Sequence, residues 1–164
     1  MKNILLILLS LYCLAGMAQT QEPLKAGMAA PDFSYQDVNG KVVNLKDLRG
    51  KYVYIDIWAT WCTPCRGELP FLQKLKQKMS GKNIVFVCIS CDKDVEVWKK
   101  MVKEYELTGI QLNTGGDKNF MKAFGVRGIP RFILLDPDGK IIHAEMTRPS
   151  QEETLESLME LEGI

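Results

Sequence analysis

The sequence has almost no excess charge of either sign. Its 164 residues include 21 Lys and Arg against 20 Asp and Glu, which gives a formal net charge of +1 at pH 7. Electrostatic binding to nucleic acid or to an anionic membrane surface needs a clear basic excess, so we expect neither partner. The sequence also lacks internal repeats and low-complexity segments. At 46% hydrophobic and 25% charged residues, it has the composition of one globular domain with a sizeable core.

A long apolar run is also missing. The N-terminal apolar segment, residues 4–14, is well short of the roughly 20 residues that a membrane-spanning helix needs. It follows Lys2 and is followed by small residues at positions 15–18, an order typical of a secretory signal peptide. We therefore predict a signal peptide over residues 1–18 and a single domain over residues 19–164, rather than a membrane anchor.

This signal predicts export to the periplasm or another extracytoplasmic space, where disulfide chemistry is sustained. Cys13 offers the alternative of a lipoprotein anchor. However, Tyr12 is bulky where lipidation sites of the known type have a small residue, so we favour cleavage without lipidation.

Two of the five cysteines, Cys62 and Cys65, stand at the predicted start of a helix. Residues 52–57 are largely apolar on both faces and predict a buried strand, and residues 63–79 predict the helix that follows. Unpaired amides and the helix dipole stabilise a thiolate there, so the pKa of Cys62 should fall below its free value of about 8.5. Pro64 suits the first turn, and cysteines three apart on that turn can close a disulfide. The pair predicts a reversible two-electron switch.

The other elements follow in an order that suggests the architecture. A strand, a helix and a second strand in succession imply a right-handed parallel crossover, and Trp98 is expected in the core. The expected strands are a hairpin over residues 33–45 that turns at Asn39-Gly40, a strand over 83–90, a short strand within the loop over 108–116, and a hairpin over 131–146. The expected helices are one that ends at about Leu107 and is capped by Asp92 or Asp94, and a short one from Asp117 to Gly125. A capping box of Ser150 and Glu153 should open the last helix, with Leu155, Leu158 and Met159 facing inward.

Several motifs make a family resemblance specific. They are Ala30-Pro31-Asp32-Phe33, Gly50-Lys51, Trp58-Ala59-Thr60-Trp61-Cys62-Thr63-Pro64-Cys65, Glu68-Leu69-Pro70, Gly125-Val126-Arg127-Gly128-Ile129-Pro130 and Asp136-Pro137-Asp138-Gly139-Lys140. Their order and spacing resemble the exported TlpA/ResA-like branch of the thioredoxin superfamily over about residues 28–160. The resemblance implies an α/β thioredoxin fold, a mixed central sheet with helices on both faces, here with an added N-terminal hairpin.

The resemblance also implies a thiol–disulfide oxidoreductase. Cys62 is then the nucleophile at the helix mouth and Cys65 the resolving thiol one turn inside. Pro130 stands where this superfamily has a cis proline beside the disulfide, and the backbone of Ile129 should pair with an incoming peptide. We expect the substrate-binding surface to comprise Trp61, Thr63, Pro64, Ile129 and Pro130, with Trp58 and Trp61 packing around the sulfurs.

Two acidic residues are candidates for proton transfer. Asp56 interrupts an otherwise apolar strand, and a buried carboxylate is costly unless it has a partner or a role. In thioredoxin-like proteins an Asp six residues before the first cysteine exchanges protons with the second; burial should raise its pKa. Glu68 matches a glutamate that tunes the thiols in the ResA-like branch. The alternatives, a hydrogen-bonded structural Asp56 and a Glu68 that merely complements the helix dipole, stay open, as does the choice between the two residues.

We expect the substrate to be a disulfide-containing protein and the redox partner to be a membrane thiol-redox protein. We expect no cofactor beyond the Cys62–Cys65 pair, and a monomer. Reductase activity is favoured over oxidase or isomerase activity by the Thr-Pro dipeptide and the family. Haem attachment is excluded because no His follows either Cys-x-x-Cys pair, and the peroxiredoxin signature would need Pro at Ile55 and Thr at Ala59.

The second pair of cysteines, Cys88 and Cys91, opens one further alternative, a four-cysteine zinc site with the first pair. Zinc pairs sit in tight knuckles, whereas Cys88 lies within a predicted strand. Side chains three apart on a strand point to opposite faces, so the two should not bridge each other. We expect Cys88 to be a buried core thiol and Cys91, at the end of the strand, to be an inert loop cysteine, with an auxiliary thiol near the active site as the alternative.

Overall fold

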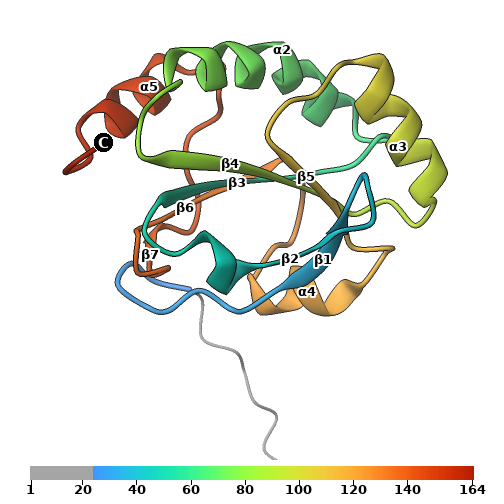
Figure 1. Cartoon of the computed structure of the whole chain (residues 1–164), viewed down its shortest axis with the longest axis horizontal. Helices are drawn as coiled ribbons and strands as arrows, with labels where there is room; N and C mark the ends of the chain where they lie inside the picture. The colour runs from blue at the N-terminus through green and yellow to red at the C-terminus, as the bar shows by residue number, and fades with distance from the viewer. Residues whose placement is uncertain (1–23) are drawn as a thin grey trace, which may run out of the picture.

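The computed structural model describes residues 24–164, so the predicted signal peptide lies outside the described residues. The chain forms a seven-stranded mixed sheet with helices on both faces (Figure 1). The elements are β1 (Ser34–Asp37), β2 (Val42–Asn44), the 3-10 helix η1 (Leu45–Leu48), β3 (Tyr52–Trp58), α2 (Thr63–Lys78), β4 (Ile84–Ser90), α3 (Val95–Glu104), β5 (Ile110–Asn113), α4 (Lys118–Ala123), β6 (Arg131–Leu135), β7 (Ile141–His143) and α5 (Glu152–Met159). Within this described part, no helix has the length and apolarity to cross a bilayer.

The strand order, β2-β1-β5-β4-β3-β6-β7, places β3 at the centre of the sheet. β3 pairs in parallel with β4 and antiparallel with β6, and β4 pairs in parallel with β5. The N-terminal hairpin joins the sheet through an antiparallel pairing of β1 with β5. This arrangement confirms the predicted thioredoxin fold with an added N-terminal hairpin.

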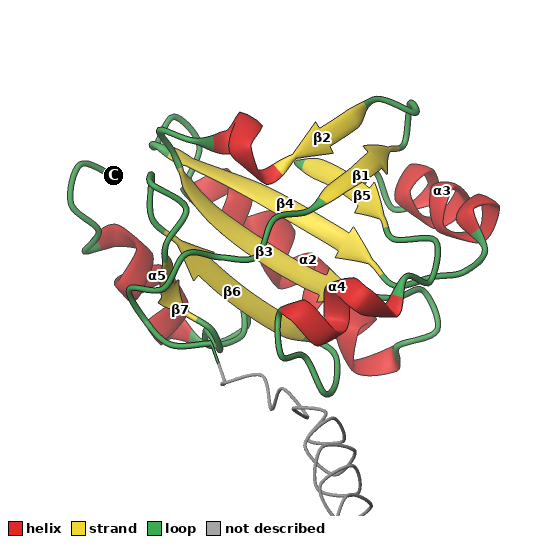
Figure 2. Ribbon diagram, turned by 90° about the horizontal axis from the view of Figure 1, so that it is seen from below, coloured by secondary structure: helices red, strands yellow, loops and turns green. Residues whose placement is uncertain are grey.

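The central strand divides the core into two layers. All seven residues of β3 are buried, and alternate side chains point to opposite faces. Tyr54 and Trp58 pack with α2, α3 and α5 on one face, while Ile55 and Ile57 pack toward α4 on the other. Figure 1 shows the three helices over one face, and Figure 2 shows α4 over the opposite face. Burying a large apolar side chain contributes about 1.5–3 kcal/mol, so β3 anchors both layers and fixes where its C-terminal end emerges.

The structure decides two local predictions about helix ends. Asp94, not Asp92, caps α3, accepting from the amides of Glu96 and Val97. The predicted capping box of Ser150 and Glu153 is wrong, because α5 begins after Gln151, which makes no side-chain cap bond.

The inward face of α5 also differs from the prediction. Leu158 is fully buried as expected, but Met159 is 47% exposed, and Thr154 is buried in the layer under α5 instead. The hydroxyl of Thr154 donates to the carbonyl of Arg148 at 2.6 Å, and this bond satisfies the buried polar group that the apolar pattern did not anticipate.

Candidate active site

Cys62 and Cys65 form a disulfide where β3 gives way to α2, with their Cα atoms 5.2 Å apart. Cys62 is the N-cap of α2, and its sulfur accepts a hydrogen bond from the amide of Cys65 at 3.2 Å. Pro64 occupies the first turn, where no amide partner is lost. The same amide and the dipole of a 16-residue helix would stabilise a thiolate on Cys62 once the disulfide opens.

The two tryptophans near the disulfide differ in their exposure to solvent. Both cysteines are buried, Cys62 at 5% and Cys65 at 2% exposure. Trp58 is fully buried and packs in the same cluster as the disulfide, as predicted. Trp61 is 67% exposed and, with Thr63 and Pro64, which are also exposed, it forms the outer rim; its packing around the sulfurs stays a prediction.

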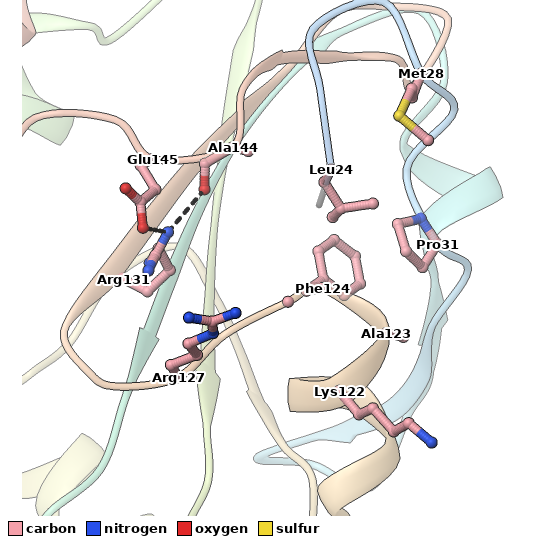
Figure 3. A pocket seen from close by; sticks show the side chains of 11 residues that line it. Leu24, Met28, Pro31, Lys122, Ala123, Phe124, Arg127, Arg131, Ala144 and Glu145 are labelled. Carbon is pink, nitrogen blue, oxygen red and sulfur yellow. Dashed lines mark hydrogen bonds and ion pairs between the residues drawn. The ribbon is translucent and has the colours of Figure 1, made fainter. Parts of the chain in front are cut away.

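The Ile129–Pro130 peptide bond is cis, as predicted, and both residues are partly exposed. Ile129 packs against both core layers, so its backbone is held at the boundary between them. An open groove of about 870 Å³ begins beside this loop and includes Arg127 and Arg131 in its wall. Figure 3 shows these two side chains across from Leu24 and Phe124, with Arg131 paired to Glu145.

Asp56 lies on the α2 side of β3, between Tyr54 and Trp58, and is 4% exposed. Burial raises the pKa of its carboxyl group to about 7, and nearby Glu68 adds to this rise, while Lys76 and a hydrogen bond with Cys88 oppose it. A carboxyl group that titrates near neutral pH can accept a proton from a thiol and later release it. The predicted direction of the pKa shift is therefore confirmed.

Glu68 is buried at 8% exposure but engages the segment before α5. Its carboxylate accepts from the amide of Ser150 at 3.0 Å and from the Ser150 hydroxyl at 2.9 Å, and Arg148 lies 3.9 Å away. This is why Ser150 does not cap its own helix. In this oxidised form Glu68 connects α2 to the segment before α5. Asp56, in contrast, forms no ion pair with any charged side chain of residues 24–164.

One residue of the site was missed by the sequence reasoning. Asp92, buried at 3% exposure, accepts from the amide of Thr60 at 2.9 Å, from its hydroxyl at 2.7 Å, and from the hydroxyl of Ser90 at 2.6 Å. Asn113 donates to the same Ser90 hydroxyl at 3.1 Å. Thr60 stands two residues before Cys62, so Asp92 fixes the active-site loop to the end of β4. The sequence feature that could have identified Asp92 is an acidic residue shortly after the end of β4, the strand that runs parallel to β3.

The other two cysteines of residues 24–164 lie on opposite faces of the sheet, as predicted. Cys88 is buried on the α2 side, whereas Cys91 lies in the opposite layer with its sulfur 3.4 Å from that of Met121. Burial raises the pKa of each thiol to about 11. The structure favours the inert loop cysteine over the alternative of an auxiliary thiol, because Cys91 packs in the layer opposite to that of the disulfide. Among residues 24–164, no three metal-ligating side chains come together in one group.

The comparisons with known proteins agree with this geometry. The Redoxin family matches residues 25–160. The thiol-disulfide oxidoreductase ResA of Bacillus cereus is 33% identical over 147 residues, covering 87% of this chain and 84% of ResA.

Two solved structures are similar across most of the chain. The solution structure of a candidate thiol-disulfide oxidoreductase from Bacteroides vulgatus is 56% identical, with a TM-score of 0.74 over 85% of this chain and 88% of that one. The crystal structure of a candidate thiol:disulfide interchange protein DsbE from Chlorobium tepidum is 28% identical, with a TM-score of 0.72 over 83% and 94%. The chain belongs to the Redoxin family and is a ResA-like thiol–disulfide oxidoreductase with the thioredoxin fold.

Proposed function

We propose that this oxidoreductase is exported and reduces disulfides of extracytoplasmic proteins through a Cys62/Cys65 cycle. The observation that carries the proposal is the disulfide at the start of α2, lying in the same core layer as a buried Asp56 whose pKa is about 7. Export rests on the signal-like order of residues 1–18. The sulfurs alone carry the electrons, without a further cofactor.

The cycle begins with the reduced pair. The Cys62 thiolate attacks one sulfur of the substrate disulfide, that disulfide breaks, and the departing substrate thiolate takes up a proton. Cys65 then gives its proton to Asp56 and attacks the Cys62 sulfur. The Cys62–Cys65 disulfide forms, and the second substrate thiolate leaves. Two electrons have passed to the substrate, and an external dithiol, for which we propose a membrane thiol-redox protein, must return two electrons to the pair.

The surface around the disulfide suits a polypeptide substrate. Trp61, Thr63 and Pro64 form an exposed apolar and hydroxyl-bearing rim, and Ile129 offers its backbone beside the cis proline. The groove described above has Arg127 and Arg131, which flank the segment of Ile129 and Pro130, in its wall. We propose that the chain flanking a substrate cysteine lies along this surface, and that the enzyme acts as a monomer.

Trapping of mixed disulfides tests the assigned roles. Cys65→Ala should retain the first attack and accumulate mixed disulfides through Cys62, because resolution is lost. Cys62→Ala should trap nothing from the same extract. Non-reducing electrophoresis with mass spectrometry measures both, and equal trapping by the two variants would contradict the assignment.

The direction of electron flow is tested by the reduction potential of the pair. A reductant should lie nearer the value of about −270 mV for thioredoxin than that of about −120 mV for the oxidant DsbA. Equilibration with glutathione or dithiothreitol buffers, followed by alkylation, measures this potential. A value near that of DsbA would favour the oxidase alternative with the same site.

A further inference from the structure

The ammonium group of Lys76, a residue of α2, lies between this helix and the sheet, although the sequence around Lys76 gives no sign of it. It is partly buried, and its nitrogen donates to the carbonyl of Thr108 at 2.6 Å, to the sulfur of Cys88 at 3.4 Å and to the side-chain oxygen of Gln73 at 3.4 Å. An ammonium has three hydrogens, and these three neutral acceptors take all of them. The group is thus held in a fixed position.

The charge of Lys76 has no carboxylate in direct contact. No ion pair joins it to any acid of residues 24–164. Cys88, which Lys76 contacts, connects it to an acid, because Asp56 stands directly opposite Cys88 in the parallel pairing of β3 with β4. Cys88 in turn stands opposite Gln111 of β5. One row across the sheet thus brings the carboxyl group, the thiol and an amide side by side beneath α2.

Cys88 is suited to lie between the two charged groups. Burial raises the pKa of its thiol to about 11, so at neutral pH the sulfur keeps its proton. It accepts from Lys76, and its S–H is available to Asp56, whose pKa is lowered by this hydrogen bond. Thiols donate and accept weakly in water, but in a buried site of low effective dielectric the same bonds are stronger.

The other groups that face Asp56 do not supply a second positive charge. Opposite it on β6 stands the apolar Phe132. The titratable groups around it are Tyr54 on β3, Cys88 on β4, and Glu68 and Lys76 on α2, with the disulfide cysteine Cys65 at the head of α2. Of these only Lys76 is cationic, and it acts against both burial and Glu68.

We propose that Lys76 and Cys88 are positioning residues for Asp56: the ammonium group of Lys76, held against the Cys88 sulfur, keeps the carboxyl group opposite that sulfur ready to receive the proton of Cys65. The inference rests on the proposed resolution step, in which the proton passes from the Cys65 sulfur to a carboxylate oxygen of Asp56 as Cys65 attacks Cys62. Without the cation of Lys76, a smaller fraction of Asp56 is ionised at pH 7, and fewer molecules can accept that proton at a given time.

Direct titration of Asp56 tests the electrostatic claim without any turnover. The ¹³C carboxyl resonance of Asp56, assigned by its loss in Asp56→Asn, is followed against pH in the oxidised protein, where Cys65 does not titrate. Lys76→Met removes the charge but keeps an apolar stem, and the midpoint should rise by about one pH unit. Lys76→Arg keeps the charge and should restore most of the shift. Lys78→Met removes an exposed lysine of the same helix and should leave the midpoint unchanged.

Cys88→Ala provides an independent variant that leaves the lysine in place. It removes the thiol between the two groups, so the midpoint of Asp56 should rise, by less than in Lys76→Met. Because this variant removes a single sulfur atom, it can still test the proposal if Lys76→Met does not fold. An unchanged midpoint in both variants overturns the proposal, and so does a midpoint that falls.

The pH profile of the resolving step tests the functional claim. A mixed disulfide between Cys62 and a reporter thiol is prepared, and release of the reporter is followed from pH 5 to pH 9.5. In Lys76→Met, release at pH 7 should slow by about fivefold, because a one-unit rise leaves about a tenth of Asp56 ionised, and it should recover at high pH. In the Asp56→Asn background, Lys76→Met should change nothing further.

The two readouts separate the inference from the proposed function. A shifted Asp56 midpoint supports the positioning role even if the protein reduces no protein disulfide, an outcome that would count against the proposed function alone. A slower release that is equal at every pH, with an unmoved midpoint, would show that Lys76 only secures α2 against the Thr108 segment, and it would overturn the inference.

Discussion

Asp56 should lower the stability of the protein at neutral pH. Its pKa is about 7 in the folded protein against an ordinary value of 3.8, so the folded state binds the proton more tightly. Stability is therefore greatest below about pH 4 for this group and falls as the pH rises through 7. The full difference in pKa corresponds to a loss of about 4 kcal/mol in the free energy of unfolding above pH 8.

Asp56→Asn should thus raise the free energy of unfolding at pH 8 by roughly 2–4 kcal/mol while changing it little at pH 4. Urea unfolding at the two pH values measures both changes, and Glu68→Gln at the same pH values serves as the comparison. An equal effect of Asp56→Asn at both pH values would assign its influence to packing rather than to the charge.

The burial of Asp56 and the raised pKa of its carboxyl group could be predicted from the sequence because an acid inside an apolar strand stands out against its neighbours. Lys76 could not, because a lysine at a polar helix position looks the same whether its ammonium faces water or a thiol. Glu68 was noticed but its partner was not, since the contact with Ser150 joins residues 82 positions apart. Sequence patterns indicate which residues are unusual, whereas side-chain contacts between distant elements need the fold.

The loop between β3 and α2 depends on the end of β4 for its position. Asp92 accepts three hydrogen bonds there, two of them from Thr60. Removing a buried acceptor leaves its donors without partners, which costs about 1–3 kcal/mol for each donor at full effect. Asp94, two residues later, is exposed and makes only the N-cap bonds of α3.

These neighbouring acids form a matched pair for mutagenesis. Asp92→Ala should lower the free energy of unfolding by roughly 3–5 kcal/mol, whereas Asp94→Ala should lower it by about 1 kcal/mol, as expected for loss of an N-cap. Equilibrium unfolding in urea measures both. Comparable losses in the two variants would mean that Asp92 serves only the chain turn after β4 and does not secure the active-site loop.

The order of strands and helices was predictable because it follows from local periodicity and turn residues. The continuous burial of β3 and the long apolar run of β4 leave few ways to arrange a parallel crossover. The start of α5 was not predictable in this way. Ser150 has the residue type of an N-cap, but its hydroxyl bonds to Glu68, so a tertiary contact replaced the local one.

The two layers of the molecule also separate its cysteines by function. The disulfide and Cys88 share the layer under α2, while Cys91 lies in the layer of α4. The face of each thiol followed from the period of the strand, but the neighbours of Cys91 did not, because α4 covers that end of the sheet from a distant part of the chain. Its contact with Met121 places it among apolar side chains.

Alkylation of the reduced protein should therefore show three separate behaviours. Cys62 should react fastest at pH 7, since the start of α2 stabilises its thiolate. Cys91 is partly exposed with a pKa of about 11, so it should react slowly and with little dependence on urea below the unfolding transition. Cys88 is 2% exposed and lies beneath α2 against the central strand, so it should react only when the whole domain opens.

The urea dependence of labelling distinguishes these routes. If Cys88 becomes reachable only by global unfolding, the logarithm of its labelling rate should rise with urea along the slope m of the equilibrium transition. Mass spectrometry of peptides after timed exposure to iodoacetamide measures each site, and Cys91→Ser removes the other free thiol of residues 24–164. A Cys88 rate that is independent of urea would reveal a local opening of α2 over the Asp56 row, and the buried thiol would then be exposed by motion of the active-site helix alone.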